Sequence, residues 1–197
     1  MPRSLKGKEV QGEVSATGEG DKAEDWKEGT KGWEPPREGW IKVNVDGSFV
    51  EQTGEAGVGV IARNWQGEVI FSAWRVIFRC ASALEAEALS CVEGLRLATQ
   101  WAQEPVVLEM DCKCVVEAMK SGEGRSEVSF LIMEVKELTE LIVNWEVVQV
   151  KRECNVIAHE LAHLARRNCH SAVWLGREPA CVIDQVKFEC NSLLMPS

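Results

Sequence analysis

The stretch Ile41-Lys42-Val43-Asn44-Val45-Asp46-Gly47-Ser48 decides the fold prediction. Its apolar residues alternate with polar ones, which is the period of two expected of a half-buried strand. Gly47 and Ser48 then break the alternation and indicate a turn. Asp46 therefore falls near the end of a strand, where its carboxylate could bind a metal ion or start the turn through local hydrogen bonds.

The remaining strands and helices follow in an order that predicts the architecture. Strands expected at 56–64 and 68–78 form an antiparallel meander with the first strand. The patterns then predict a helix at 82–101, a strand at 105–110, helices at 112–120 and 127–142, a strand at 145–150 and a helix at 155–167. This order is typical of an α/β fold with a five-stranded mixed sheet and helices on both faces.

Composition divides the chain into three parts. Residues 1–32 are rich in Gly, Glu, Lys and Ser, which predicts a disordered polar leader. Residues 33–170 hold the predicted elements and form the expected domain. The extension 171–197 is expected to pack partly on this domain through its apolar residues, Val173, Trp174, Val182, Ile183 and Val186.

Cysteine usage and charge limit the compartment and the partners. The eight cysteines form no C-x-x-C pair, and the N-terminal residues contain no apolar run typical of a signal peptide. We therefore expect a protein of the nucleus or cytoplasm that is not secreted, is a monomer and has no membrane partner. The net charge is −9, and residues 41–170 carry 13 Lys/Arg against 19 Asp/Glu, which argues against strong non-specific binding to phosphate backbones.

Several motifs, taken in order, resemble one known family. It is the plant ribonuclease H-like domain, also called reverse-transcriptase-like, which is found alone or at the end of non-LTR retrotransposon polyproteins. The resemblance covers about residues 33–189 and implies the ribonuclease H fold. Its segments are Trp33 to Ser48 (W-E-P-P-x-x-G-W-I-K-V-N-V-D-G-S), Gly57 to Asn64 with Gly67, Ala86 to Leu89 with Gly94 and Leu95, Glu109 to Cys112, Lys151 to Ala162, and Trp174 to Val186.

The resemblance implies hydrolysis of the RNA strand of an RNA–DNA hybrid. Asp46, Glu87 and Asp111 match the acidic positions of the family, so it implies that they are catalytic and bind the metal ions. The cofactor implied is Mg²⁺, with Mn²⁺ as a possible substitute. Carboxylate oxygens suit such hard cations, and a pair of cations can activate water and stabilise the leaving oxygen. Asp111 could also merely cap the following helix.

The fourth acidic position departs from many family members, because His159 stands there. The resemblance still makes His159 a candidate catalytic residue that orients water or substrate. Imidazole is a poor ligand for Mg²⁺ and suits softer metals. Activity could then be low, favoured by Mn²⁺ or absent, and the alternative function is a silent domain that binds nucleic acid or protein.

Candidate contacts with the nucleic acid lie in two places. Lys151 and Arg152 precede the last predicted helix and Asn155 begins it, and the two cations could instead be ordinary solvated charges. Asn44 and Ser48 flank Asp46 and are candidates to contact the ribose 2′-OH, which distinguishes RNA from DNA.

The same helix carries a second motif, His159-Glu160-Leu161-Ala162-His163, which has the H-E-x-x-H pattern of zinc proteases. Glu178 or Glu189 would be the third zinc ligand. The longer metzincin pattern fails, since Arg166 and Cys169 occupy its Gly and His positions. This function is therefore a remote alternative, and His163 could simply be a partly exposed helix residue.

Overall fold

The computed structural model describes residues 32–121 and 127–191. The predicted leader thus lies almost wholly outside the described residues, as do the last residues of the predicted extension. Six strands form one mixed sheet in the order β5-β4-β1-β2-β3-β6. They are β1 (Ile41–Val50), β2 (Glu55–Asn64), β3 (Val69–Ile77), β4 (Val106–Met110), β5 (Trp145–Gln149) and β6 (Ala172–Leu175).

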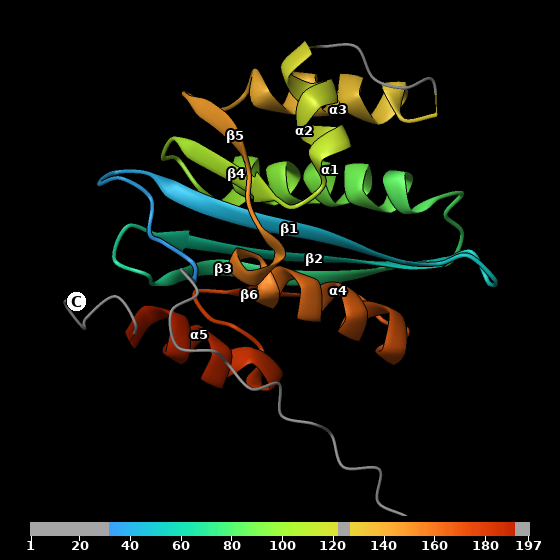
Figure 1. Cartoon of the computed structure of the whole chain (residues 1–197). Coiled ribbons are helices and arrows are strands. Elements are labelled where there is room, and N and C mark those ends of the chain that lie inside the picture. Colours follow the sequence, from blue (N-terminus) through green and yellow to red (C-terminus); the bar gives the residue numbers. More distant parts are fainter. Residues whose placement is uncertain (1–31, 122–126, 192–197) are drawn as a thin grey trace, which may run out of the picture.

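Helices cover both faces of the sheet, as predicted (Figure 1). One layer holds α1 (Ala83–Trp101), α2 (Lys113–Ser121) and α3 (Ser129–Thr139), and the other holds α4 (Val156–Asn168) and α5 (Ile183–Asn191). The short helices η1 (Arg152–Cys154) and η2 (Ala180–Val182) precede α4 and α5. Strands β1, β4 and β5 run parallel to one another, while β1, β2, β3 and β6 pair antiparallel.

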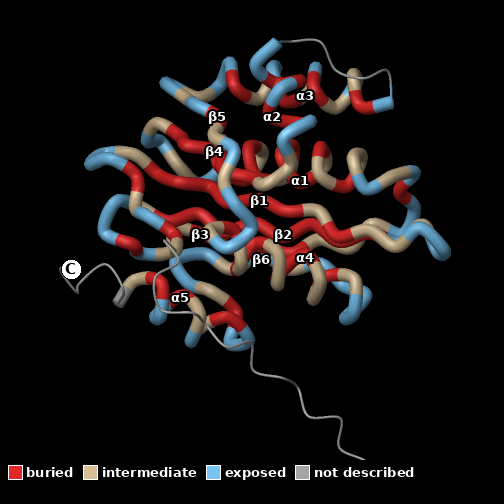
Figure 2. The backbone as a smooth tube through the Cα atoms, viewed as in Figure 1, coloured by how far each residue is buried: buried red, intermediate tan, exposed pale blue. Residues whose placement is uncertain are grey.

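Strand β1 lies at the centre of the sheet and is buried from Ile41 to Asp46 (Figure 2). Its alternation assigns each side chain to one helical layer. A Cβ added at Gly94 of α1 would lie 2.5 Å from Val45, so the odd-numbered residues face α1. The even-numbered residues, which include Asp46, face α4. The polar side chains of this strand are thus enclosed between the sheet and the layer that contains α4. The alternation alone predicted a half-buried strand and not this enclosure.

Glycines of β2 let α4 pack directly on the sheet. A Cβ at Gly57 would lie 2.1 Å from the Ala162 carbonyl oxygen, and one at Gly59 would lie 2.0 Å from that of Ala158. Real Cβ atoms do not come this close, so glycine is needed for the close backbone approach. Because Gly59 pairs with Asp46 in the sheet, this approach brings the first turns of α4 beside Asp46.

The sheet has six strands, so the predicted number of five is wrong. The additional strand, β6, pairs antiparallel with β3 at the edge of the sheet. Val173 and Leu175 of β6 remain about half exposed while the alternate residues are half-buried, so apolar residues occupy both faces and leave no alternation to detect. Residues 172–191 also contribute Val182 and Val186 to the core between the sheet, α4 and α5.

Within the described ranges, no helix has both the length and the apolar character that crossing a bilayer requires.

Candidate active site

Asp46 is held in the middle of the sheet. It lies on β1 between β2 and β4, and only 2% of its surface is exposed. Burial raises the pKa of this carboxyl, while His159 and Arg152 oppose the shift and Asp111 adds to it. A carboxylate at this position is costly to keep charged unless cationic groups or hydrogen-bond donors surround it.

Gly47 allows α1 to reach Asp46 from the opposite layer. A Cβ at Gly47 would lie 2.5 Å from the backbone of Ala86 and 2.6 Å from the nitrogen of Glu87. The helix begins after Ser82, whose Oγ accepts a hydrogen bond from the Glu85 N–H at 3.1 Å. This contact between strand and helix places the Glu87 side chain beside Asp46.

Glu87 is the most perturbed carboxyl of the site. Burial, followed by the negative charges of Asp46 and Asp111, raises its pKa to about 9. Its Oε2 is buried and has no hydrogen-bond partner within the part of the chain that the structure describes. Buried polar atoms without partners are uncommon and often indicate a missing ion or water.

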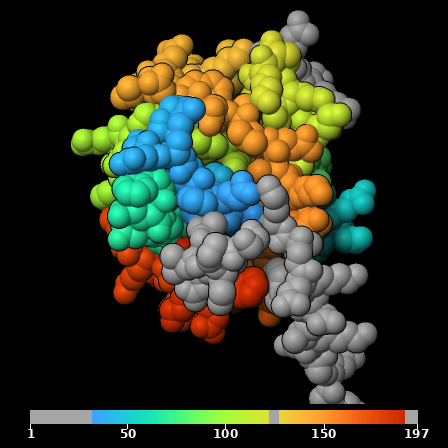
Figure 3. All heavy atoms as spheres, turned by 60° about the vertical axis from the view of Figure 1, so that its left-hand side comes forward, coloured from blue at the N-terminus to red at the C-terminus, as the bar shows by residue number. Residues whose placement is uncertain are grey.

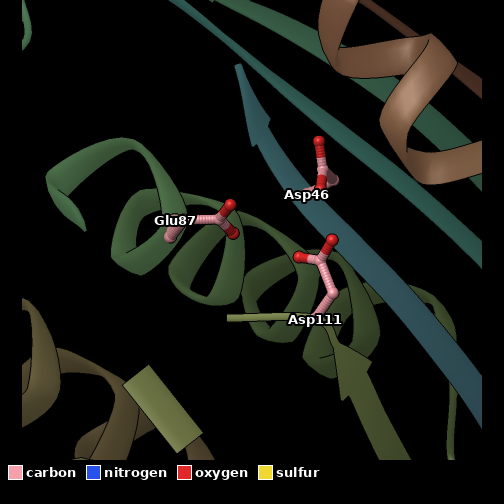
Figure 4. Close-up of side chains that lie close together, drawn as sticks. All are labelled: Asp46, Glu87 and Asp111. Atoms are coloured by element: carbon pink, nitrogen blue, oxygen red, sulfur yellow. The ribbon is translucent and has the colours of Figure 1, made fainter. Parts of the chain in front are cut away.

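Asp111 completes a group of three carboxylates. It directly follows β4, which runs parallel to β1 with Asn44 opposite Glu109, so Asp46 and Asp111 lie toward the same end of neighbouring strands. One oxygen of each of Asp46, Glu87 and Asp111 lies within 4.8 Å of the others (Figure 4). The three side chains come from β1, α1 and the end of β4, and they are brought together as the sequence predicted.

This arrangement fits a hard divalent cation. The donor set consists of carboxylate oxygens, which Mg²⁺ and Mn²⁺ prefer. The unpartnered Oε2 of Glu87 is an independent reason to expect a cation here, because a cation would give this atom the partner that it lacks among the described residues. Three carboxylates this close repel one another, and a cation removes that repulsion.

His159 approaches Asp46 from the α4 layer. Its Nδ1 lies 3.0 Å from Oδ2 of Asp46, and its Nε2 lies 2.7 Å from Nη2 of Arg152. A guanidinium group only donates hydrogen bonds, so Nε2 is the acceptor and Nδ1–H donates to Asp46. The imidazole of His159 is thus held between a carboxylate and a guanidinium, at the position where many family members have an acid.

Asn44 and Asn155 are the predicted substrate contacts that the structure encloses. Both are 1% exposed. The Asn44 amide donates to Oε2 of Glu109 at 3.0 Å and to Oδ1 of Asn155 at 3.3 Å, and its oxygen accepts from Trp33 Nε1 at 3.0 Å. The Asn155 amide donates to the carbonyl of Val45 at 2.9 Å. These partners favour a structural role: Asn155 ties the start of α4 to β1 next to Asp46.

Two buried ion pairs support this network, and the sequence reasoning missed both. Lys42 Nζ lies 2.6 Å from Glu109 Oε1, and Arg63 pairs with Glu189 of α5. The Arg63 guanidinium also stacks on Trp33 at 3.7 Å from the ring centroid. The available signal was that Lys42 and Asn44 share a strand face with Asp46, which implies a polar layer on that side of β1.

The other predicted substrate contacts are less enclosed or lie at the surface. Ser48 follows Asp46 on the same face of β1 and is 5% exposed. Lys151 and Arg152 are exposed at the start of η1. Of these three residues, Arg152 is the one that the structure joins to the carboxylate site, through His159.

The two histidines of the H-E-x-x-H pattern contact other side chains of the protein. His159 bonds to Asp46 and Arg152, and its ring packs edge-on against that of His163 at 4.4 Å. Glu189, a proposed third ligand, is paired with Arg63. In residues 32–121 and 127–191, the group that could hold a metal is Asp46, Glu87 and Asp111. The contacts of His159 and Glu189 therefore do not favour the zinc-protease alternative, and the carboxylate group favours a site for a hard cation.

Comparison with known proteins agrees with this geometry. A family described as reverse transcriptase-like matches residues 44–165. An Arabidopsis thaliana protein provisionally named a ribonuclease H protein is 33% identical over 135 residues, which are 68% of this chain and 22% of that protein. This chain thus spans about a fifth of the length of that relative.

Solved ribonuclease H structures share the fold. The ribonuclease H1 of Halobacterium salinarum superposes with a TM-score of 0.62 at 21% identity, covering 66% of this chain and 99% of that one. The LC11 ribonuclease H1, solved in complex with an RNA/DNA hybrid, gives a TM-score of 0.57 at 20% identity over 66% of this chain and 98% of that one. The N-terminal ribonuclease H domain of a Mycobacterium tuberculosis protein gives 0.60 at 24% identity over 66% and 94%. The family match over residues 44–165 and these superpositions together show that the chain belongs to the reverse transcriptase-like family and has the ribonuclease H fold.

Proposed function

We propose that this domain is a ribonuclease H-type endonuclease that hydrolyses the RNA strand of an RNA–DNA hybrid. The observation that carries the proposal is the meeting of Asp46, Glu87 and Asp111, with an oxygen of each within 4.8 Å of the others. The hybrid as substrate is supported by the LC11 ribonuclease H1, which has this fold and was solved with an RNA/DNA hybrid bound.

Asp46, Glu87 and Asp111 would hold two divalent cations, with Mg²⁺ preferred and Mn²⁺ as a substitute. Such cations supply the chemistry of phosphodiester hydrolysis by activating a water and neutralising the charge on the leaving oxygen. The protein contributes a rigid frame, because the three carboxylates belong to a central strand, a long helix and the end of a parallel strand. A preorganised charged site needs little rearrangement when the reaction occurs.

His159 and Arg152 act on the substrate side of Asp46. The Nδ1–H of His159 fixes the orientation of the Asp46 carboxylate, and its Nε2 faces the exposed Arg152. A phosphate of the substrate competes for the Arg152 guanidinium, which binds phosphate in a forked geometry. Once Arg152 turns to the phosphate, Nε2 of His159 is available to accept a hydrogen bond from water and to position it.

The test is cleavage of a labelled RNA–DNA hybrid by the purified chain with Mg²⁺ or Mn²⁺. We expect Asp46→Asn to abolish cleavage. The matched control is Glu117→Gln, which removes an exposed carboxylate of α2 outside the cluster and should cleave like the wild type. Cleavage that survives Asp46→Asn would refute the proposed site.

The second candidate is a domain that binds the hybrid, or a protein, without cleaving. His159 favours it, because an imidazole bonded on both nitrogens replaces the acidic side chain that many family members have. Binding of labelled hybrid by the wild type, with no cleavage in either metal, would support this function. Saturation binding and cleavage measured on the same samples separate the two candidates.

The remaining expectations concern the state and place of the protein. We propose a monomer of the nucleus or cytoplasm whose partner is the hybrid. Light scattering of the purified chain tests whether it is a monomer, and imaging of a tagged chain in cells tests its compartment.

A further inference from the structure

A pocket of about 250 Å³ lies between α5 and the segment that joins η1 to α4. It is separate from the three carboxylates. Figure 3 shows this side of the molecule, with the segment that begins at Gly32 in blue, the segment that contains η1 and α4 in orange, and α5 in red. The residues that line it include Gly32, Glu153, Val156, Asp184, Gln185 and Phe188.

The lining of this pocket suits a ring with an apolar body and one hydrogen-bond donor. Val156 and Phe188 give it apolar surface. Oε1 of Gln185 is buried and lacks a hydrogen-bond partner among the described residues. Indole has this combination, since it is a large apolar ring whose single polar group is an N–H donor. A cavity of about 150 Å³ already holds benzene, so this pocket has room for the larger indole.

One tryptophan of this chain lies within easy reach. Trp26 is the single aromatic residue of 1–32, and it precedes Gly32 by six residues. Six residues span up to about 20 Å when extended, and Gly32 itself lines the pocket. The short connection makes the entropy cost of closing the loop small.

The link between Trp26 and the described chain has a net positive charge, opposite to that of the rim. Lys27 and Lys31 lie in this link together with Glu28, whereas Glu24 and Asp25 precede Trp26. The rim carries the exposed carboxylates of Glu153 and Asp184. From reach, ring chemistry and charge, we propose that Trp26 docks its indole in this pocket and donates its N–H to Gln185, so that the N-terminal segment is anchored against α5.

Docking connects the N-terminal segment with the carboxylate site. Glu153 of the pocket adjoins Arg152, whose guanidinium contacts His159. Val156 of the pocket is the first residue of α4. An indole held between this segment and α5 therefore restrains the short helix that presents Arg152.

Fluorine NMR of the full chain labelled with fluorotryptophan tests the docking directly. The Trp26 resonance is assigned by its loss in Trp26→Phe. We expect it to be displaced from the position of free fluorotryptophan, and to return there in Phe188→Ala and in Gln185→Leu while the other tryptophan resonances stay in place. The control, Phe130→Ala, removes an exposed phenylalanine of α3 and should leave the Trp26 resonance unchanged.

Two outcomes would overturn the proposal. A Trp26 resonance at the free position in the wild type would show that the indole is not docked. A displaced resonance that returns to the free position on dilution would make a second copy of the chain the partner. A Trp26 resonance that is displaced at every protein concentration, and that depends on Phe188 and Gln185, supports docking within one chain.

Limited trypsin digestion gives a second measurement that does not depend on labelling. We expect cleavage after Lys27 and Lys31 to be several-fold faster in Trp26→Ala than in the wild type, because docking restrains this segment. Trp101→Ala removes an exposed tryptophan at the end of α1 and should leave these rates unchanged. Equal rates in Trp26→Ala and the wild type would contradict the docking.

Discussion

Replacing Glu87 by Gln should make the metal-free protein more stable and remove most of its stabilisation by Mg²⁺. The reason lies in the crowded carboxylates: Glu87 has a buried oxygen without a partner in the described chain, and it lies beside Asp46 and Asp111. Glutamine keeps the shape of the side chain and is neutral without taking up a proton. The variant therefore avoids the cost of neutralising Glu87 in the folded, metal-free protein, and it lacks the charge with which Glu87 would bind a cation.

The magnitude follows from the titration of Glu87. In the folded, metal-free protein its pKa is raised from 4.5 to about 9, so the folded state keeps a proton that the unfolded chain releases above pH 4.5. This contribution to stability is fully present below pH 4.5 and is lost as the pH rises toward 9. At about 1.4 kcal/mol per pH unit, the loss at about pH 7.5 is at most roughly 4 kcal/mol. Because the side chain is partly exposed, we expect about 1–2 kcal/mol.

The assay is thermal unfolding followed by calorimetry at about pH 7.5, in a chelator and then in Mg²⁺. A gain of about 1–2 kcal/mol corresponds to a rise in Tm of roughly 3–6 °C for Glu87→Gln in the chelator. Mg²⁺ at ten times its Kd should stabilise the wild type by about 1.4 kcal/mol, or roughly 3–5 °C, and the variant by much less. The advantage of the variant in chelator should shrink as the pH falls toward 4.5, the ordinary pKa of Glu87.

The control for this series is again Glu117→Gln, which should match the wild type in both buffers. If Glu87→Gln has the wild-type Tm in the chelator and the wild-type response to Mg²⁺, the Glu87 carboxylate is not part of a shared cation site. That result would also remove the main support for the proposed nuclease activity.

Three further changes test other parts of the structure. Glu189→Gln leaves the buried charge of Arg63 uncompensated and should lower the free energy of unfolding by roughly 3–5 kcal/mol in a denaturant titration. Gly47→Ala forces a methyl group against the backbone of α1 and should cost about 2–3 kcal/mol and weaken the Mg²⁺-dependent rise in Tm, whereas Gly32→Ala, which has open space, should change neither quantity. If the wild type cleaves, Arg152→Ala should raise KM for the hybrid more than tenfold at low salt and flatten the salt dependence of KM, and an unchanged KM would assign Arg152 to the folded structure alone.

The residues that repeat with a clear period were predictable from the sequence. The alternation around Val43 and Val45 predicted the central strand, and the resemblance to the family identified the three carboxylates. The way in which they meet was not visible, because it depends on Gly47 admitting the backbone of α1 at a distance that no residue pattern encodes. Asp111 was likewise identified by the resemblance, and the structure shows the parallel pairing of β4 with β1 that brings it to the same end of the sheet as Asp46.

The two buried ion pairs were not predicted from the sequence. Glu189 was considered only as a remote zinc ligand, and Lys42 and Arg63 were assigned no partner. Their partners are distant in the chain, so the pairing could not be inferred from local sequence. Asn44 stays a predicted substrate contact because no substrate is bound, and the sequence did not show that its amide joins β1 to Glu109 and to the start of α4.

The pairing of Arg63 with Glu189 also affects how the protein can fold while it is being synthesised. The guanidinium of β2 is synthesised 126 residues before the carboxylate that neutralises it. The nascent sheet must wait for residue 189 to leave the exit tunnel before this arginine can be enclosed at low cost. A stalled or shortened nascent chain would expose that face of the sheet to chaperones, whatever the state of its carboxylates.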